Sequence, residues 1–436
     1  MNRTIQISLA MIGLMIVTVA HGHDQIPGAP QTKPVLITGA IVHTVDGDVI
    51  KNGSVLFANG KIAAVGKKIK APKKAITIDA CGKHVYPGLI EPLTDLGLRE
   101  ISAVDATDDR REFGSLNPNA RAIEAINPDS ELIPVARANG VLFAVASPQG
   151  RWLRGQAALI QLDGWTAGEM SLVGTAGLSV DWSYLEPNDT SADGRISKRK
   201  QRRTEFADLL TKARQYQANR KATPNQTPTD VRLESLLPVI NRKLPLIAQA
   251  DELLEIESAV AFAQEHDLRL IIFGGYDAAD CAGLLRKYDV PVMISGVHRL
   301  PMRRNDAYDA PYTLAKRLTD AKVRYCIGGA GAGSPNGAAA ARNLPYHAAT
   351  AVAYGLSPDE AIKRITLATA EIFGVDKQIG SITPGKDATL FMSDGDIMEG
   401  TSNVTDAWIQ GRVVDLSSRH TMLYDKYRKK YQRGSK

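Results

Sequence analysis

Cysteine is scarce in this sequence. Only three occur among 436 residues, at Cys81, Cys281 and Cys326. They are odd in number, widely spaced and surrounded by apolar neighbours, so they form neither a disulfide framework nor a zinc cluster of the usual spacing. Composition sets few other limits, because 44% hydrophobic and 23% charged residues are ordinary values for a globular chain of this length.

Long apolar runs are lacking too. An apolar stretch at residues 7–20 follows Arg3 and is too short for a membrane span. Small residues at 18–22 offer cleavage sites, so we predict a secretory leader over residues 1–22 and a periplasmic or secreted protein without a membrane span. An uncleaved anchor is the competing interpretation. A lipoprotein is excluded, because no cysteine lies near the cleavage sites.

The chain carries no strong charge of one sign, with a formal net charge of +6. Basic clusters at 67–70, 198–203 and 426–436 lie in or beside polar sequence, which favours solvated surface. A nucleic-acid face would need aromatic residues interleaved with the cations. Only the tyrosines of the last cluster come near this pattern: Tyr424, Tyr427 and Tyr431. Their helical spacing indicates packing residues, so we expect no nucleic-acid partner.

Both ends of the remaining chain resemble short β-strands. Tight-turn pairs at Asp46-Gly47, Asn52-Gly53 and Asn59-Gly60 separate apolar segments near the start, and Gln410-Gly411 does so near the end. Asn-Gly and Asp-Gly pairs favour two-residue hairpins because both residues accept a positive φ. We predict one composite β-sandwich domain that is built from residues 33–86 and 379–416. Residues 417–436 form a basic tail.

The middle of the chain, residues 87–378, alternates strands with amphipathic helices. Near-continuous apolar runs are typical of parallel strands covered on both faces. They occur at residues 141–147, 157–162, 245–250, 268–275, 291–297 and 323–329. Repeated strand-helix units over this length predict an α/β fold, a (β/α)8 barrel, with a doubly wound sheet as the alternative. Residues 186–243 are polar and basic, and we interpret them as an elaboration with a helix near 204–220.

The segment VYPGLIEPLTDLGL at residues 85–98 has the pattern of a buried strand that leads into a polar loop. It resembles the first barrel strand of the amidohydrolase superfamily, in which Pro-Gly-Leu-Ile-Asp precedes two metal-binding histidines separated by one residue. The two histidine positions hold Leu93 and Asp95 here. The segments RAIEAINPDSELIPVARANGV, GQAALIQLDGWTAGEM and NLPYHAATAVAYGLSPDEAIKRITLATAEIFGV resemble the imidazolonepropionase-related branch, and IGSITPGKDATLF also matches the superfamily.

The resemblance implies further metal ligands: a lysine or acid on the fourth strand, histidines on the fifth and sixth, and an aspartate on the eighth. In the fourth strand, Asp181 is the only acid and lysine is absent. The later positions hold Gln249, the Gly274-Gly275 pair and Ala330. Glycine and alanine side chains donate no electrons, and a neutral amide is a poor zinc ligand. We therefore predict no metal ligands and no resident cofactor, although the family implies a divalent metal.

Polar residues nevertheless follow several predicted strands. Loops after parallel strands share one end of a barrel, so these residues are candidates for one substrate-binding pocket. The candidates are Asp95, Arg154, Gln249, His298, Arg303, Arg304 and Asp309. Arginine pairs there suit a ligand carboxylate. The alternative interpretation is that arginines and aspartates on these loops neutralise one another as ordinary ion pairs. No catalytic residue can be named from the sequence.

Three functional hypotheses follow. The first is an exported amidohydrolase-like protein that is degenerate at the metal site and binds a small amide or peptide-like ligand. The second is an active hydrolase of cyclic amide, amide or dipeptide bonds that uses a rebuilt site. The third is a structural or interaction protein in which the barrel is only a scaffold. The fold alone does not separate them, because function depends on the site.

Overall fold

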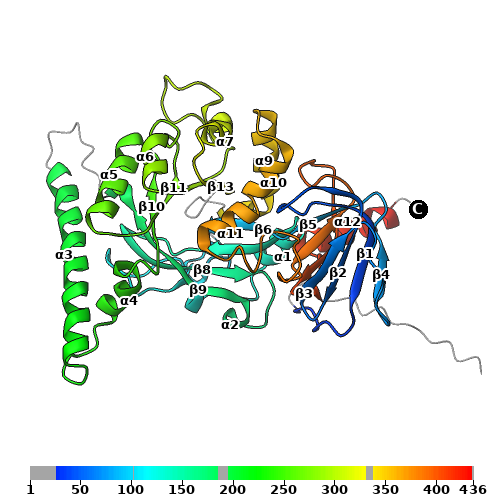
Figure 1. Ribbon diagram of the computed structural model, residues 1–436, viewed down its shortest axis with the longest axis horizontal. Helices are drawn as coiled ribbons and strands as arrows, with labels where there is room; N and C mark the ends of the chain where they lie inside the picture. Colours follow the sequence, from blue (N-terminus) through cyan, green and yellow to red (C-terminus); the bar gives the residue numbers. More distant parts are fainter. Residues whose placement is uncertain (1–25, 102, 185–194, 330–336, 435–436) are drawn as a thin grey trace, which may run out of the picture.

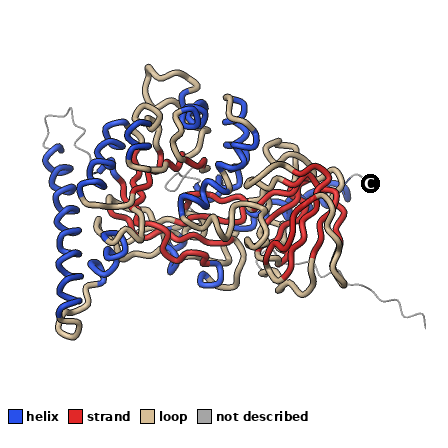
Figure 2. Tube along the Cα trace, viewed as in Figure 1, coloured by secondary structure: helices blue, strands red, loops and turns tan. Residues whose placement is uncertain are grey.

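The computed structural model describes residues 26–101, 103–184, 195–329 and 337–434 (Figure 1). The predicted leader, residues 1–22, therefore lies outside the described part of the chain. Two eight-stranded sheets organise the molecule, and each has its own cluster of buried apolar side chains. Figure 2 shows the two groups of strands side by side along the long axis, with most of the helices around one of them.

The first sheet contains strands from both ends of the chain. They are β1 (Val35–Val42), β2 (Ile50–Ala58), β3 (Lys61–Gly66), β4 (Ile76–Asp79), β5 (His84–Pro87), β14 (Leu390–Ser393), β15 (Val404–Ile409) and β16 (Arg412–Val413). Strand β14 pairs antiparallel with β5, which joins the two ends in one sheet and confirms the composite β-domain. The Asn59-Gly60 and Gln410-Gly411 pairs have positive φ and form the predicted hairpin turns. Asn52-Gly53 instead lies inside β2, at an irregularity in its pairing with β1.

The second sheet is the barrel. Its strands are β6 (Leu89–Thr94), β7 (Val141–Ala146), β8 (Leu153–Gln161), β9 (Ser171–Asp181), β10 (Leu246–Ala250), β11 (Leu270–Gly274), β12 (Val292–Ile294) and β13 (Tyr325–Ile327). They pair in sequence order from β6 to β13, which confirms the predicted α/β barrel. One strand differs from the expectation of uniform direction, because β8 is antiparallel to both β7 and β9. Its residues are as fully buried as those of a parallel strand.

Most of the helices cover the barrel and fill its connections, whereas the last one lies at the end of the molecule formed by the composite sheet. They are α1 (Leu132–Arg137), α2 (Ala167–Met170), α3 (Arg195–Ala222), α4 (Val231–Ile240), α5 (Leu253–Glu265), α6 (Ala282–Lys287), α7 (Ala310–Asp320), α8 (Gly337–Ala340), α9 (Leu344–Ala353), α10 (Pro358–Arg364), α11 (Leu367–Phe373) and α12 (Arg419–Gly434). The helix predicted at 204–220 is the greater part of α3. This helix packs on the barrel side through Phe206, whose ring stacks on Phe262 of α5 at 5.2 Å.

The barrel and the composite sheet meet at a tight contact. Gly140 precedes β7 with a φ of +80°, and a Cβ atom there would lie 2.7 Å from the ring of Phe391 in β14. Only glycine combines this backbone conformation with so close an approach. Nearby, Tyr86 of β5 stacks on Phe391 at 5.4 Å between ring centroids. The Gly140 contact holds the composite sheet close to the barrel, and the stack of Tyr86 on Phe391 joins two neighbouring strands within that sheet.

The C-terminal helix α12 differs from the prediction. Every residue from Arg419 to Arg433 is exposed, so the interpretation of Tyr424, Tyr427 and Tyr431 as packing residues is wrong. Helical spacing places these tyrosines on one face but does not supply a partner for that face. Within the described ranges, no helix is both long enough and apolar enough to cross a bilayer.

Candidate functional site

At the end of the first barrel strand, a buried ion-pair network surrounds Asp95. This residue follows β6, is fully buried, and lies 3.0 Å from Nη1 of Arg110 and 3.7 Å from Nη2 of Arg99. Arg110 also holds Asp108 through Nε at 2.7 Å, and this hydrogen bond lowers the pKa of Asp108. The other position of the expected ligand pair, Leu93, is part of the hydrophobic core.

Beside this network, Arg154 connects the fourth and fifth strand ends. Its guanidinium donates to the carboxylate of Asp181 at 2.5 Å and to the amide oxygen of Gln249 at 2.7 Å. Asp181 also accepts a hydrogen bond from the hydroxyl of Ser183 at 2.6 Å. Arg154 was expected in a loop after the second strand, but it is the second residue of β8. Because β8 runs antiparallel, its first residues lie beside the last residues of β9, where Asp181 ends the strand.

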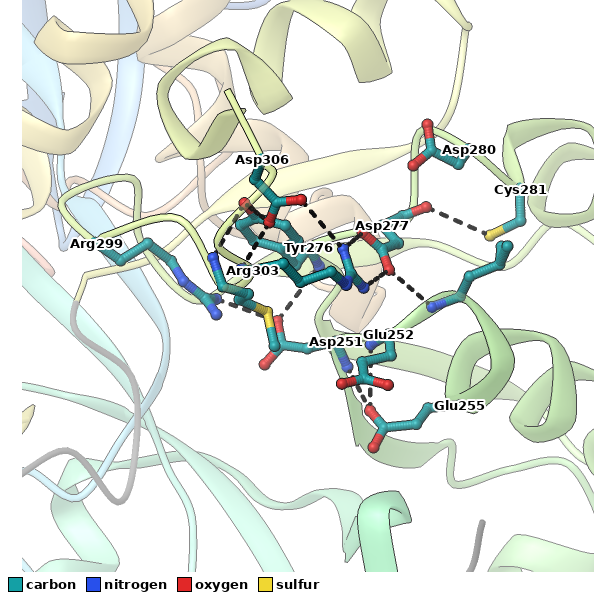
Figure 3. Close-up of polar contacts among 12 residues, drawn as sticks. Asp251, Glu252, Glu255, Tyr276, Asp277, Asp280, Cys281, Arg299, Arg303 and Asp306 are labelled. Carbon is teal, nitrogen blue, oxygen red and sulfur yellow. Dashed lines mark hydrogen bonds and ion pairs between the residues drawn. The ribbon is translucent and has the colours of Figure 1, made fainter. Parts of the chain in front are cut away.

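A third set of ion pairs lies at the ends of β10 and β11, against the loop that follows β12 (Figure 3). Arg303 makes a two-pronged contact with Asp277, with Nη1 at 3.0 Å from Oδ1. Tyr276 donates its hydroxyl hydrogen to Asp306 at 2.8 Å. On the other side of the tyrosine, Arg299 pairs with Asp251 at 3.1 Å. The ring of Tyr276 thus lies close to two guanidinium groups, at 5.1 Å from Arg299 and 5.8 Å from Arg303.

Close packing explains the glycine at the end of β11. Gly274 has a φ of +106°, and a Cβ atom there would lie 2.9 Å from Oδ1 of Asp251. A side chain at this position would therefore strain the backbone and meet the carboxylate that Arg299 binds. A histidine at Gly274 would therefore require the Asp251 side chain to move and would strain the backbone at its positive φ.

Two histidine rings near β12 lie against each other, with their planes tilted by 30°. His347 of α9 is 4% exposed, and its Nδ1 accepts hydrogen bonds from the backbone nitrogens of Val297 at 3.1 Å and His298 at 3.4 Å. Burial, and next the charge of His298, lower the pKa of His347 to about 3. The ring centroids of His298 and His347 are 4.1 Å apart, and Nε2 of His298 lies 2.7 Å from the hydroxyl of Thr350. His347 therefore anchors the loop that carries Arg299 and Arg303.

Glu91, inside β6, is the acid of the strand motif. It is 1% exposed, and each of its carboxylate oxygens lies 3.0 Å from the backbone nitrogen of Gly329. Burial raises its pKa to about 8, although hydrogen bonds from the backbone partly oppose the shift. A Cβ atom at Gly329 would lie 2.8 Å from the Glu91 carboxylate, so glycine is needed beside it.

The sequence-predicted candidates are thus divided among separate contacts. Arg154 and Gln249 meet directly, but Asp95, His298 and Arg303 each have other partners. Arg304 is exposed, and Asp309 precedes α7 as its N-cap without a side-chain capping bond. Ala330, the expected eighth-strand position, lies outside the described residues.

Sequence reasoning missed Arg110, Tyr276 and Asp277, which contact these candidates, and the pair of Arg299 and Asp251 beside them. Position was the available signal, because each of these residues lies in a segment that follows a barrel strand. In the ranges that the structure describes, no three His, Cys, Asp or Glu side chains are grouped to hold a metal ion. The arrangement can bind charged and hydrogen-bonding groups.

Comparison with known proteins agrees with this architecture. The model of the amidohydrolase family matches residues 177–414, more than half of the chain. The chain therefore belongs to the amidohydrolase family, as the sequence motifs indicated. A solved structure of an amidohydrolase from Thermotoga maritima MSB8 superposes with a TM-score of 0.76 and 25% identity, covering 87% of this chain and 99% of that one.

Two relatives extend the comparison. An imidazolonepropionase from Symbiobacterium thermophilum is 23% identical over 381 residues, which are 78% of this chain and 83% of the relative. The amidohydrolase tasK of Hapsidospora irregularis is 22% identical over 391 residues, or 82% of this chain. The matched part spans only 39% of the length of tasK, so similarity to it concerns a part of that protein.

Proposed function

We propose that this protein is an exported amidohydrolase-family barrel that binds a small amide or peptide-like ligand without metal-dependent hydrolysis. The observation that carries the proposal is the position of Asp95, which is fully buried within 3.7 Å of two guanidinium groups. A divalent cation at this carboxylate would lie beside two positive charges in a site shielded from water, where their repulsion is strong. Leu93, at the neighbouring position, supplies no donor atom.

The other described positions support the same conclusion. The amide oxygen of Gln249 already accepts a hydrogen bond from Arg154 at 2.7 Å, and the Asp181 carboxylate is bound by the same guanidinium. Gly274 has no side chain, and a Cβ atom there would lie 2.9 Å from the Asp251 carboxylate. These residues do not fit a divalent metal ion, since metal ligands need free donor atoms that converge on one point.

The ion pairs at the ends of β10 and β11 support ligand binding, because one side of this set is exposed to solvent. The Arg303 side chain is 45% exposed while its partner Asp277 is 9% exposed, so the guanidinium keeps a face toward solvent. Arg303, Arg299 and Tyr276 together offer hydrogen-bond donors and an aromatic surface, which suit a carboxylate or an amide carbonyl. The names of the relatives, amidohydrolase and imidazolonepropionase, direct the choice of ligand to amides.

A calorimetric screen tests the binding proposal. N-acylated amino acids and short peptides are titrated into the wild type and into Arg303→Ala. We expect at least one ligand class to bind, and the substitution to weaken it about tenfold or more, because a charge-assisted hydrogen bond is lost. The matched control is Arg242→Ala, an arginine paired with Asp267 at the opposite end of β10. Binding that ignores Arg303→Ala, or no binding at all, would favour the scaffold hypothesis.

Elemental analysis tests the metal part separately. Protein purified without chelators is expected to hold no stoichiometric zinc, manganese or iron, because the described positions offer no convergent donor set. About one tightly held ion per chain would contradict this and favour an active hydrolase with a rebuilt site. The double substitution Leu93→His and Asp95→His should not create activity, because a competent metal site also needs its remaining ligands and their supporting hydrogen bonds.

A further inference from the structure

The C-terminal helix α12 exposes residue types that proteins normally cover. It is attached to the body at its first turn, where His420 Nδ1 lies 3.2 Å from Arg342 and Thr421 exchanges hydrogen bonds with Ser418. Ser418 is buried, but all of the following residues up to Arg433 are exposed. Figure 1 shows α12 at the end of the molecule formed by the composite sheet, at the opposite end of the long axis from α3.

One face of α12 is an aromatic stripe, defined by Leu423, Tyr424, Tyr427 and Tyr431. Residues three and four apart lie on the same side of a helix, so these four side chains form a continuous band. The tyrosines are 65%, 46% and 69% exposed, and Leu423 is 39% exposed. A surface helix usually turns such a face toward a core or a partner.

Cations border the stripe. The helix contains six lysine and arginine residues and a single acid, Asp425, which pairs with Arg428 at 2.9 Å. Lys430 lies over the rings of Tyr427 and Tyr431, at 5.9 Å and 5.7 Å, and Lys426 lies 5.7 Å from the ring of Tyr427. The surface therefore presents amphipathic rings with positive charges beside them, and a complementary partner must be anionic with an apolar layer underneath.

We propose that α12 attaches this protein peripherally to membranes that contain anionic phospholipid. A helix with a basic polar face and an apolar or aromatic face lies in the plane of the membrane interface. Tyrosine suits that position because its ring enters the apolar layer while its hydroxyl stays in water. The lysines and arginines that border the stripe then meet the lipid phosphates.

Two other occupants fit less well. A second copy of the chain would bring another basic α12 against the first, and like charges repel. Single-stranded nucleic acid is bound in grooves that combine a basic track with stacking rings. An isolated helix that projects from the body offers a convex surface, which matches a planar interface better than a single strand.

Vesicle sedimentation with the full chain tests the proposal. Vesicles are made of phosphatidylcholine alone or of equal parts phosphatidylcholine and phosphatidylglycerol. We expect binding to the anionic vesicles that weakens at high salt, because exposed charges are screened. The triple variant Lys426→Gln, Lys429→Gln, Lys430→Gln should bind on the order of a hundredfold more weakly, from the loss of three cations at the surface.

Two further variants test whether the position of the lost charge matters and how much the tyrosine rings contribute to binding. The variant Lys67→Gln, Lys68→Gln, Lys70→Gln removes the same charge from exposed residues in the composite sheet domain and should bind like the wild type. Replacement of Tyr424, Tyr427 and Tyr431 by serine should weaken binding about tenfold. All chains share residues 1–25, so any contribution of that segment cancels. Equal binding by the two lysine variants, tighter binding to single-stranded DNA than to anionic vesicles, or a stable dimer in sedimentation equilibrium would overturn the proposal.

Discussion

Acidification from pH 7 to about pH 4 is expected to destabilise the fold strongly through His347. Burial, and next the charge of His298, lower the pKa of this histidine to about 3. The neutral ring accepts hydrogen bonds at Nδ1 from the backbone nitrogens of Val297 and His298. The unfolded chain binds a proton near pH 6.5, whereas the folded chain does not until about pH 3. Stability is therefore complete above pH 6.5 and falls as the pH drops toward 3, by roughly 4 kcal/mol in all.

The measurement is urea denaturation across this pH range. His347→Gln keeps an acceptor but cannot bind a proton, so its stability should change less between pH 7 and pH 4 than that of the wild type. His43 contributes in the same direction, because burial lowers its pKa to about 4. The exposed His420, replaced by glutamine, serves as the control. If His347→Gln and His420→Gln show the same loss on acidification as the wild type, the anchoring role assigned to His347 is wrong.

Glu91→Gln is expected to stabilise the protein at neutral and alkaline pH. Burial raises the pKa of Glu91 to about 8, from a usual value near 4.5. Between these values the unfolded chain releases a proton that the folded chain keeps, so stability falls as the pH rises from 4.5 to 8. Glutamine has no charge to desolvate and can still accept from the Gly329 nitrogen. We expect a gain of about 4 kcal/mol at pH 8 and little change at pH 4.5.

Thermal or urea denaturation of Glu91→Gln at the two pH values tests this expectation. The exposed Glu265, replaced by glutamine, removes the same charge without burial and should leave stability unchanged at both. A variant that is destabilised equally at pH 4.5 and pH 8 would show that Glu91 acts through its shape or its hydrogen-bond geometry. A gain in stability of Glu91→Gln over the wild type that grows with pH would show that ionisation of the buried Glu91 is costly.

Much of the fold could be predicted because local patterns carry it. Continuous apolar runs marked the barrel strands, and pairs such as Asn59-Gly60 marked hairpins through their tolerance of positive φ. The direction of β8 could not be predicted, because a continuous apolar run has the same pattern in a parallel and in an antiparallel strand. Arg154 was placed in a loop for another reason: the apolar run begins only at residue 157, whereas β8 begins at Leu153 and includes Arg154 beside Asp181.

The site was harder to predict, because its partners are set by tertiary geometry. The motif at residues 85–98 showed which positions had lost histidine, but it did not show that Arg110, fifteen residues after Asp95, binds that carboxylate. Periodicity likewise grouped the tyrosines of α12 on one face without showing that nothing in the described structure covers them. Pattern defines the faces of an element, whereas contacts define which face is buried.

The pairing of β14 with β5 has a consequence for biosynthesis. Strands of the composite sheet are made both before and after the barrel, and β5 lacks one neighbour until Leu390 and the residues after it have been synthesised. Until then, the β5 edge that β14 will cover is an unpaired strand edge, which is prone to wrong association. The closing contact joins segments about three hundred residues apart, and such distant contacts form slowly. The chain thus has a late folding step, in which its final strands protect the edge of its first ones.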